Sequence, residues 1–408
     1  MSRSGAIFAL ILALGATAAP GLDESAHARD PAGGAGSGLE RRLIWTLADV
    51  RAGRLDDALA HVSQLVEAQP DFELAQLIRG DLLLALGRPL SAFGEFAGIA
   101  RPLARPLDSE AHRQGLRDEA RARLARFLQE PPSRAVPAEL VQLPRNARHA
   151  ILVDTANYRL YVFEVRDDGV HRLADFYVSI GRAGNDKSAE GDEKTPTGLY
   201  KVASYLPGEQ LPDMYGPGAF PIDYPNDWDR LQGRTGSGIW IHGTESARYS
   251  RPPLSSLGCV TLSNEDFAAL RGWVQVGTTP VVLTKGVRWA SSASVDAVRG
   301  SVQAAVDRWR ADWESRDTER YLSHYGASFR TAGMSREAFA AHKRRVNASK
   351  SFIAVALDDL AIYGYPGEPA TVRVEFTQSY RSDSFRATKK KWQHWRLDDG
   401  RWRIVSEG

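Results

Sequence analysis

The pattern of hydrophobic and polar positions divides the chain into three successive regions. From residue 39 to about residue 130, apolar residues recur at helical spacing, and no convincing strand pattern interrupts them. Over residues 149–285 the pattern changes to short runs rich in β-branched and aromatic residues, which is typical of strands. From about Ser294, helical spacing returns and is followed by long alternating runs. We therefore predict a multidomain protein with a helical region, a mostly-β domain and an α+β domain.

Two stretches of the first region align at a period of about 34 residues. IWTLADVRAGRLDDALAHV aligns with LIRGDLLLALGRPLSAFGEF, so that Gly53 corresponds to Gly87. Each of these glycines stands where a predicted helix ends. A helix–turn–helix period of this length resembles tetratricopeptide repeats. Such a region either forms a groove for a partner peptide or serves as a helical spacer.

Turn and cap signals divide the central region into short strands and one helix. The expected strands lie in the runs HAILVDTANYRLYVFEV, VHRLADFYVSIG, GLYKVASYL, SGIWIHG, CVTL and PVVLTK. The DDG sequence at residues 167–169 predicts a hairpin turn. NEDFAALRGWV predicts one helix, with Ser263 or Asn264 as its N-cap.

The last region is expected to form two helices followed by an antiparallel sheet. VDAVRGSVQAAVDRWRADWESRDTERYLSHY predicts a long amphipathic helix, and SREAFAAHKRRV predicts a shorter one. Three β runs follow, and the last of them turns at Asp399 and Gly400. This order resembles the nuclear transport factor 2-like superfamily, of the Cds6/SnoaL type, whose α+β cone wraps around a pocket. The resemblance implies a binding or assembly module.

The run KKKWQHWRL, residues 389–397, interleaves cations with aromatic residues. Alternation along a hairpin places Lys391 and Trp395 on one face, and Trp392 and His394 on the other. We interpret one face as core and the other as solvated, and a glycan or anionic wall contact is the alternative.

Composition and the first residues limit where the protein acts. The chain has 408 residues, 25% of them charged, and a net charge of +2, which is too mild to indicate nucleic acid binding. MSRSGAIFALILALGATAAPGLDESAHA has the positive start, apolar run and small-residue end of a secretory signal peptide. No later run approaches the roughly 20 apolar residues of a membrane span. We expect an exported protein without a transmembrane span after cleavage, and an uncleaved membrane anchor is the alternative.

Export draws attention to the single cysteine. One cysteine cannot form an intramolecular disulfide, and a free thiol is open to oxidation in an oxidising compartment. Cys259 is therefore either a nucleophile or a small buried hydrophobic residue. A nucleophilic thiol needs a nearby base, and His242 lies upstream at the end of SGIWIHG. His242 is the expected partner of Cys259, because the downstream His324, His342 and His394 lie in the last region. We predict that antiparallel neighbouring strands bring the two residues together.

Five sequence blocks around this pair follow the order of the L,D-transpeptidase catalytic domain of the YkuD type. They are Gly181 after a β run, KTPTGLYKV, FPIDYPNDWDR, GRTGSGIWIHG and SSLGCVTL. This part of the chain therefore resembles that family. The resemblance implies a β-rich domain that acts on peptidoglycan stem peptides and needs neither a metal ion nor a cofactor.

The resemblance also implies roles for individual residues. Cys259 would attack a stem-peptide carbonyl and form a thioester, which an amine or water then resolves. His242 would act as general base and then acid, oriented by the backbone carbonyl of Gly243. The backbone of Leu257, Gly258 and Cys259 would hold the oxyanion. Candidate substrate contacts are Ser256, Thr261, Tyr249, Arg251 and Thr195.

Two positions depart from the usual pattern of the family. Leu257 stands where members usually carry a second histidine, in a Ser-His-Gly-Cys block, and Thr261 stands where arginine or asparagine is common. The leucine at position 257, together with DYPNDWDR and GRTGSG, resembles the branch of the YafK-like peptidoglycan–lipoprotein hydrolases. We predict a transpeptidase. The alternatives are an L,D-hydrolase that trims stem peptides or releases wall-bound lipoprotein, and an inactive wall-binding scaffold.

These patterns and resemblances give the expected domain order. It is a signal peptide (1–28), a flexible linker (29–38), a helical tetratricopeptide-like region (39–130), a linker (131–145), an L,D-transpeptidase catalytic domain (146–286) and a nuclear transport factor 2-like domain (294–408). The leader and the family together imply the periplasm of a Gram-negative cell. The implied partners are stem peptides, with a wall-linked lipoprotein or another protein as a possible partner of the helical region.

Overall fold

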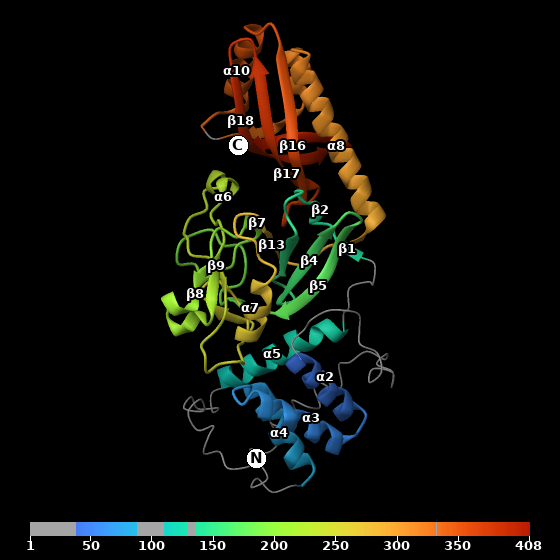
Figure 1. Ribbon diagram of the computed structural model, residues 1–408, viewed down its shortest axis with the longest axis vertical. Coiled ribbons are helices and arrows are strands. Elements are labelled where there is room, and N and C mark those ends of the chain that lie inside the picture. The colour runs from blue at the N-terminus through green and yellow to red at the C-terminus, as the bar shows by residue number, and fades with distance from the viewer. Residues whose placement is uncertain (1–37, 88–109, 129–134, 332) are drawn as a thin grey trace.

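The three predicted regions follow one another along the long axis of the molecule (Figure 1). The computed structural model describes residues 38–87, 110–128, 135–331 and 333–408. The predicted signal peptide, and all of the linker 29–38 except its last residue, lie outside these residues. The helical region occupies one end, the strand-rich domain the middle, and the C-terminal domain the other end.

The first region is helical, as predicted, but its described residues do not show the predicted repeat. Its helices are α2 (Gly38–Arg51), α3 (Leu55–Ala68), α4 (Glu73–Ala85) and α5 (Glu110–Leu128). Gly53 after α2 and Gly87 after α4 adopt φ angles of 75° and 62°, which glycine reaches without a steric penalty. The second predicted copy continues into residues 88–109, which lie outside the described residues.

The central domain consists of two main sheets around one apolar core. The first has the strand order β5-β4-β3-β13-β7, and the second has the order β12-β10-β9-β8. Apolar side chains from both sheets, such as Ile151, Leu160 and Ile241, fill the space between them. The strands of this domain are β3 (His149–Asp154), β4 (Arg159–Arg166), β5 (Gly169–Tyr177), β6 (Ile180–Gly181), β7 (Gly198–Lys201), β8 (Leu206–Pro207), β9 (Gly218–Pro221), β10 (Trp240–His242), β11 (Leu254–Ser256), β12 (Val260–Thr261) and β13 (Pro280–Thr284).

Local signals placed most of these elements correctly. Every predicted strand run contains a strand, and the predicted DDG turn joins β4 to β5 as a hairpin. Helix α7 (Asn264–Arg271) begins after Ser263, whose hydroxyl accepts the backbone N–H of Asp266 as an N-cap. The sequence analysis missed β9, β11 and the short helix α6 (Asp227–Leu231).

The C-terminal domain is an α+β domain, as predicted, with one helix break that was not. The predicted long helix is divided into α8 (Ser292–Glu314) and α9 (Thr318–Ser323), because Arg316 adopts a φ of 63° and Asp317 caps α9. Helix α10 (Arg336–Ala348) follows. The sheet has the order β15-β19-β18-β17-β16-β2. Its strands in this domain are β15 (Tyr325–Arg330), β16 (Ile353–Gly364), β17 (Thr371–Ser382), β18 (Arg386–Asp398) and β19 (Arg401–Glu407).

The segment predicted as a linker over residues 131–145 is ordered where the structure describes it. β1 (Ala135–Pro137) pairs with β14 (Trp289–Ser291), and β2 (Leu140–Gln142) extends the C-terminal sheet beside β16. Leu140 and Val141 are buried, so this segment forms part of the domain packing. It therefore ties the central and C-terminal domains together.

Both faces of β18 carry buried residues, His394 on one and Trp395 on the other, so the prediction of one core face and one solvated face was wrong, and the face with His394 packs against the central domain. His394 is fully buried, and its ring centroid lies 4.2 Å from that of Trp228 on α6. Burial lowers the pKa of His394 well below its usual value. Lys201 on β7 forms an ion pair of 2.6 Å with Glu375 on β17. The two domains thus share an extensive interface.

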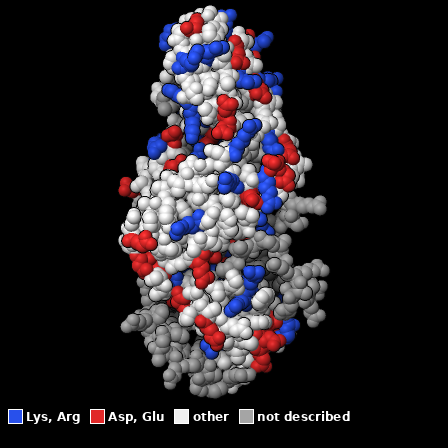
Figure 2. Space-filling view, in the orientation of Figure 1, with Lys and Arg blue, Asp and Glu red and all other residues white. Residues whose placement is uncertain are grey.

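The visible surface carries both signs of charge. In Figure 2, acidic and basic side chains are interspersed along the face shown, which agrees with the small net charge of +2. In the part of the chain that the structure describes, no helix has both the length and the apolar character needed to cross a bilayer.

Candidate active site

His242 is the last residue of β10, and Cys259 lies immediately before β12, the neighbouring parallel strand of the second sheet. The prediction of antiparallel neighbours was wrong, because β10 and β12 run parallel, with Ile241 opposite Val260 and His242 opposite Thr261. Side chains alternate along a strand, so Cys259 and Thr261 project to the same side. His242, as the partner of Thr261, projects to that side as well. Cys259 lies two residues before Thr261, the residue that pairs with His242, and we infer that both reacting side chains project from the same face of the sheet.

The imidazole of His242 is buried and held on several sides. Its Nδ1 lies 2.6 Å from the backbone carbonyl oxygen of Gly243, so Nδ1 donates its proton there and Nε2 is left as an acceptor. Nε2 lies 3.4 Å from Thr261 Oγ1. The Tyr215 ring packs edge-on against the imidazole, with the centroids 5.0 Å apart. Burial lowers the pKa of His242 to about 4, so the imidazole is neutral at neutral pH.

The thiol of Cys259 is partly exposed and rests on the beginning of β10. Sγ lies 3.4 Å from the backbone carbonyl oxygen of Gly238, to which the thiol donates. Burial raises the pKa of Cys259, and the backbone N–H of Trp240 and the charge of Arg251 oppose this rise. The resting pair is therefore a neutral thiol and a neutral imidazole.

Two predicted substrate contacts instead fix the turn that carries the nucleophile. Ser256 Oγ donates to the carbonyl oxygen of Cys259 at 2.6 Å and accepts the N–H of Gly258 at 3.1 Å. Thr195 Oγ1 donates to the carbonyl oxygen of Gly258 at 2.9 Å and accepts the N–H of Gly181 at 2.9 Å. Both hydroxyls are buried and engaged within the protein.

These hydrogen bonds change the expected oxyanion site. The N–H of Gly258 was predicted to face the oxyanion, but it is directed to Ser256 Oγ. Of the three predicted backbone donors, the N–H groups of Leu257 and Cys259 remain as candidates. The glycine serves the turn through its conformation.

Replacing Gly258 with alanine is expected to destabilise this turn. Its φ is 123°, and a Cβ there would lie 2.8 Å from the carbonyl oxygen of Lys194. We expect a loss of about 1–3 kcal/mol in the free energy of unfolding, measured in urea. Gly286→Ala is the control, because a Cβ at that position meets open space. Equal stability of the two variants would contradict the argument.

The other predicted contacts lie in different surroundings. The ring of Tyr249 is buried in the helical region, 4.6 Å from that of Phe72, and does not reach the cysteine face. The Arg251 side chain is only 14% exposed. Leu257, in contrast, is 64% exposed, two residues before the nucleophile. Thr261 contacts the imidazole of His242 and is itself buried.

The sequence analysis missed two residues that shape the site. Tyr215, at the end of the 3-10 turn η7 (Asp213–Tyr215), packs on both His242 and Trp240, with ring centroids 5.0 and 4.9 Å away. Asn264 Oδ1 accepts the N–H of Thr244 at 2.8 Å and so fixes the chain just after β10. The WIH sequence did indicate that Trp240 and His242 lie on one face of a strand, because residues two apart on a strand share a face. Nothing local pointed to Tyr215.

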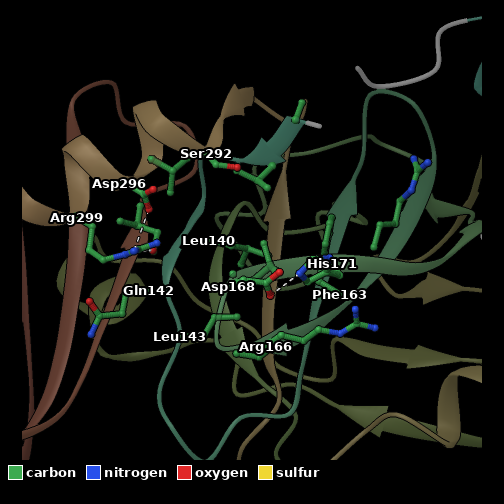
Figure 3. A pocket seen from close by; sticks show the side chains of 18 of the residues that line it. Leu140, Gln142, Leu143, Phe163, Arg166, Asp168, His171, Ser292, Asp296 and Arg299 are labelled. Carbon is green, nitrogen blue, oxygen red and sulfur yellow. Dashed lines mark hydrogen bonds and ion pairs between the residues drawn. The ribbon is translucent and has the colours of Figure 1, made fainter. Parts of the chain in front are cut away.

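A large cavity lies away from this site, at the junction of the central and C-terminal domains (Figure 3). Its volume is about 930 Å³, and Phe163 and Trp289 form part of its apolar wall. The ion pairs His171–Asp168 and Asp296–Arg299 also line it. Neither the cysteine nor the histidine of the candidate site borders this cavity. Within the described residues, no group of three or more His, Cys, Asp or Glu side chains could hold a metal ion.

Comparison with known families agrees with the geometry of the site. Residues 148–283 match the L,D-transpeptidase catalytic domain, YkuD. The chain carries a YkuD-type catalytic domain. Residues 301–408 match the Cds6 C-terminal NTF2-like domain. Both resemblances predicted from the sequence are confirmed, whereas the tetratricopeptide-like resemblance of the first region is not.

Relatives of known name share this architecture in part. The chain is 29% identical over 268 residues to "Probable L,D-transpeptidase ErfK/SrfK" of Salmonella typhimurium, an alignment that covers 60% of this chain and 83% of that protein. Bd1075 of Bdellovibrio bacteriovorus is 29% identical, with a TM-score of 0.58 over 67% of this chain and 97% of that chain. The helical cell shape determining protein Pgp2 from Campylobacter jejuni is 26% identical, with a TM-score of 0.59 over 67% of this chain and 95% of that chain.

Proposed function

We propose that this protein is a periplasmic L,D-transpeptidase that carries stem peptides of peptidoglycan as a thioester on Cys259. The observation that supports this most directly is the shared face of β10 and β12. His242, with Nδ1 bound to the Gly243 carbonyl, presents an unprotonated Nε2 beside β12, which begins one residue after the cysteine. A neutral base next to a partly exposed thiol is the minimum set for thiol acylation.

In the acylation step, the thiol proton passes to Nε2 of His242 as the sulfur bonds to the carbonyl carbon of the third stem-peptide residue. The carbonyl oxygen becomes negative, and the backbone N–H groups of Leu257 and Cys259 stabilise it. The bond to the terminal D-alanine then breaks, and its nitrogen takes the proton from Nε2. The products are a thioester on Cys259 and free D-alanine.

In the second step, an amine of another stem peptide attacks the thioester. The amine gives its proton to Nε2 of His242, the new amide forms, and the sulfur of Cys259 leaves and recovers that proton. Water can replace the amine with the same proton path, and the product is then a free carboxylate. The two outcomes differ only in the acceptor.

An L,D-hydrolase is the second candidate, and the surface beside the cysteine favours it. Leu257, two residues before the nucleophile, is 64% exposed, so the chain offers an apolar side chain to solvent there. A leucine offers no side-chain hydrogen bond to a polar acceptor, whereas water needs none. An acceptor peptide would have to be held by other groups.

Incubation of the full chain with disaccharide-tetrapeptides separates these functions. Mass spectrometry should show cross-linked dimers and free D-alanine, both absent with Cys259→Ala. D-alanine and disaccharide-tripeptide without dimers would identify the hydrolase. If the parent protein releases nothing and gains no adduct from a carbapenem, yet binds sacculi as well as Cys259→Ala does, it is a wall-binding scaffold.

The acid limb of the pH profile for acylation should fall near pH 4. Burial lowers the pKa of His242 from 6.5 to about 4, so the imidazole loses its basic function only below that pH. Burial also raises the pKa of Cys259, so the thiol stays protonated at neutral pH and still needs the base. The measurement is the second-order rate of carbapenem acylation against pH. An acid limb near 6.5 would show that the imidazole is not held neutral by burial.

A further inference from the structure

The loop between base and nucleophile, residues 244–253, is held by the helical region. Tyr249 is part of the apolar core formed by helices α2 to α5, and its ring centroid lies 4.6 Å from that of Phe72. Ser250 Oγ accepts the backbone N–H of Leu74, at the start of α4, at 3.3 Å. The middle of the loop is therefore anchored outside the catalytic domain.

The next two loop residues are held as closely. Pro252 packs on α5 with so little space that a Cβ at Gly115 would lie 2.9 Å from its Cγ. The carbonyl oxygen of Arg251 accepts the hydroxyl of Tyr177, on β5, at 2.7 Å. Burial raises the pKa of Glu119 on α5 to about 7, and the backbone N–H of Arg251 is among the groups that oppose this rise. The backbone at Arg251 is thus clamped between α5 and β5.

The side chain of Arg251 extends from this clamp to both ends of the loop. Its Nη1 donates to Thr244 Oγ1 at 3.2 Å, and Thr244 follows the glycine that orients His242. Its Nε donates to Ser255 Oγ at 3.0 Å, and Ser255 precedes the serine that closes the turn at the cysteine. One nearly buried guanidinium therefore connects the chain beside the base with the chain beside the nucleophile.

The charge of Arg251 also acts on both reacting groups. After burial, it is among the causes that lower the pKa of His242, and it opposes the raised pKa of Cys259. The charged and titratable groups that act on the guanidinium itself are Glu245 and Arg248 of the same loop, Tyr177 of β5 and Cys259. Both effects depend on where the guanidinium is held.

We propose that helices α2 to α5 are a positioning element of the active site, which holds Arg251 so that its guanidinium keeps His242 and Cys259 in reacting register. Arg251 is then a positioning residue and not the substrate contact suggested by its sequence position. The helical region is accordingly more than a spacer. The inference rests on the proposed function only in assuming that the positioned residues carry out acyl transfer.

A wedge placed on the helical side of the loop tests this without touching the site. Gly115→Ala in the full chain inserts a methyl group against Pro252, inside a helix that alanine favours over glycine. We expect carbapenem acylation of Cys259 to slow at least fivefold while the thermal midpoint changes little. Gly300→Ala, in α8 with open space around it, is the matched control and should react like the parent. A folded Gly115→Ala protein that reacts at the parent rate would overturn the proposal.

Substitution of the positioning residue itself supplies a readout that a purely structural role would not move. Arg251→Gln should shift the alkylation of Cys259 by iodoacetamide to higher pH, because the thiolate loses a nearby positive charge. Arg251→Lys keeps the charge but not the fork of hydrogen bonds, so it should restore the pH midpoint and still acylate slowly. An unchanged midpoint in folded Arg251→Gln protein would also overturn the proposal, and this result decides the matter should Gly115→Ala not fold.

The two proposals fail in distinguishable ways. Iodoacetamide alkylation requires only the thiol and its surroundings, not a stem peptide. If the parent protein shows no acyl transfer while the alkylation shifts appear as expected, the proposed function fails and the positioning element stands. If transfer occurs but no variant differs from the parent, the reverse holds.

Discussion

Replacing His242 with asparagine lowers the rate of carbapenem acylation at Cys259 by about 10²–10⁴-fold. Asparagine can still donate a hydrogen bond, so the carbonyl of Gly243, now 2.6 Å from Nδ1, need not lose its donor. What disappears is the basic Nε2. Because burial raises the pKa of the thiol, little thiolate is present at neutral pH to react without that base. Intact-mass measurements over time give the acylation rates of the parent protein and of His242→Asn, with Cys259→Ala as the blank that gains no adduct.

The control for this substitution is His171→Asn. His171 sits on β5, where its Nε2 lies 2.8 Å from Asp168 on the exposed hairpin, and its removal should leave acylation unchanged. The comparison isolates the loss of a base from the general effect of replacing a histidine. Equal acylation rates in both variants would remove His242 from the reaction.

Features fixed by neighbouring residues could be predicted from the sequence. The N-cap at Ser263 and the DDG hairpin each depend on a hydrogen bond or a backbone conformation within a few residues. The order of the five sequence blocks was enough to place the YkuD-type domain, which the family comparison confirms. The pairing direction of β10 and β12 could not be predicted in this way. The connection between them contains β11, three residues long, which shows no alternation of apolar and polar residues from which the direction of the next strand could be inferred.

The contacts that set the environment of the site span much longer distances along the chain. Ser250 and Leu74 are 176 residues apart, and nothing near Tyr249 indicates that its ring belongs to the helical core. The commitment of the Gly258 N–H to Ser256 is local, but serine side chains hydrogen-bond to backbone in many alternative ways. The folded structure was therefore needed to tell which side chains are exposed and which groups are already hydrogen-bonded, even for residues that the sequence analysis had named.

Replacing Arg159 with methionine is expected to cost about 3–5 kcal/mol in the free energy of unfolding. Arg159 on β4 is fully buried and forms ion pairs with Glu40 of α2, at 3.2 Å, and with Asp175 of β5. Methionine fills much of the space but leaves both buried carboxylates without this cation. Urea unfolding measures the loss. Arg166→Met, which removes an exposed ion pair with Glu164, should cost at most about 1 kcal/mol.

The same substitution also tests whether the helical region and the catalytic domain unfold as one unit. Glu40 lies in the helical region and pairs with both Arg159 of the catalytic domain and Arg123 of α5, so the ion network crosses the boundary between them. If this interface couples the two, the parent protein should lose helical and tryptophan signals in a single transition, and Arg159→Met should separate them. Two transitions already present in the parent protein would mean that the helices are held too weakly to position anything in the catalytic domain.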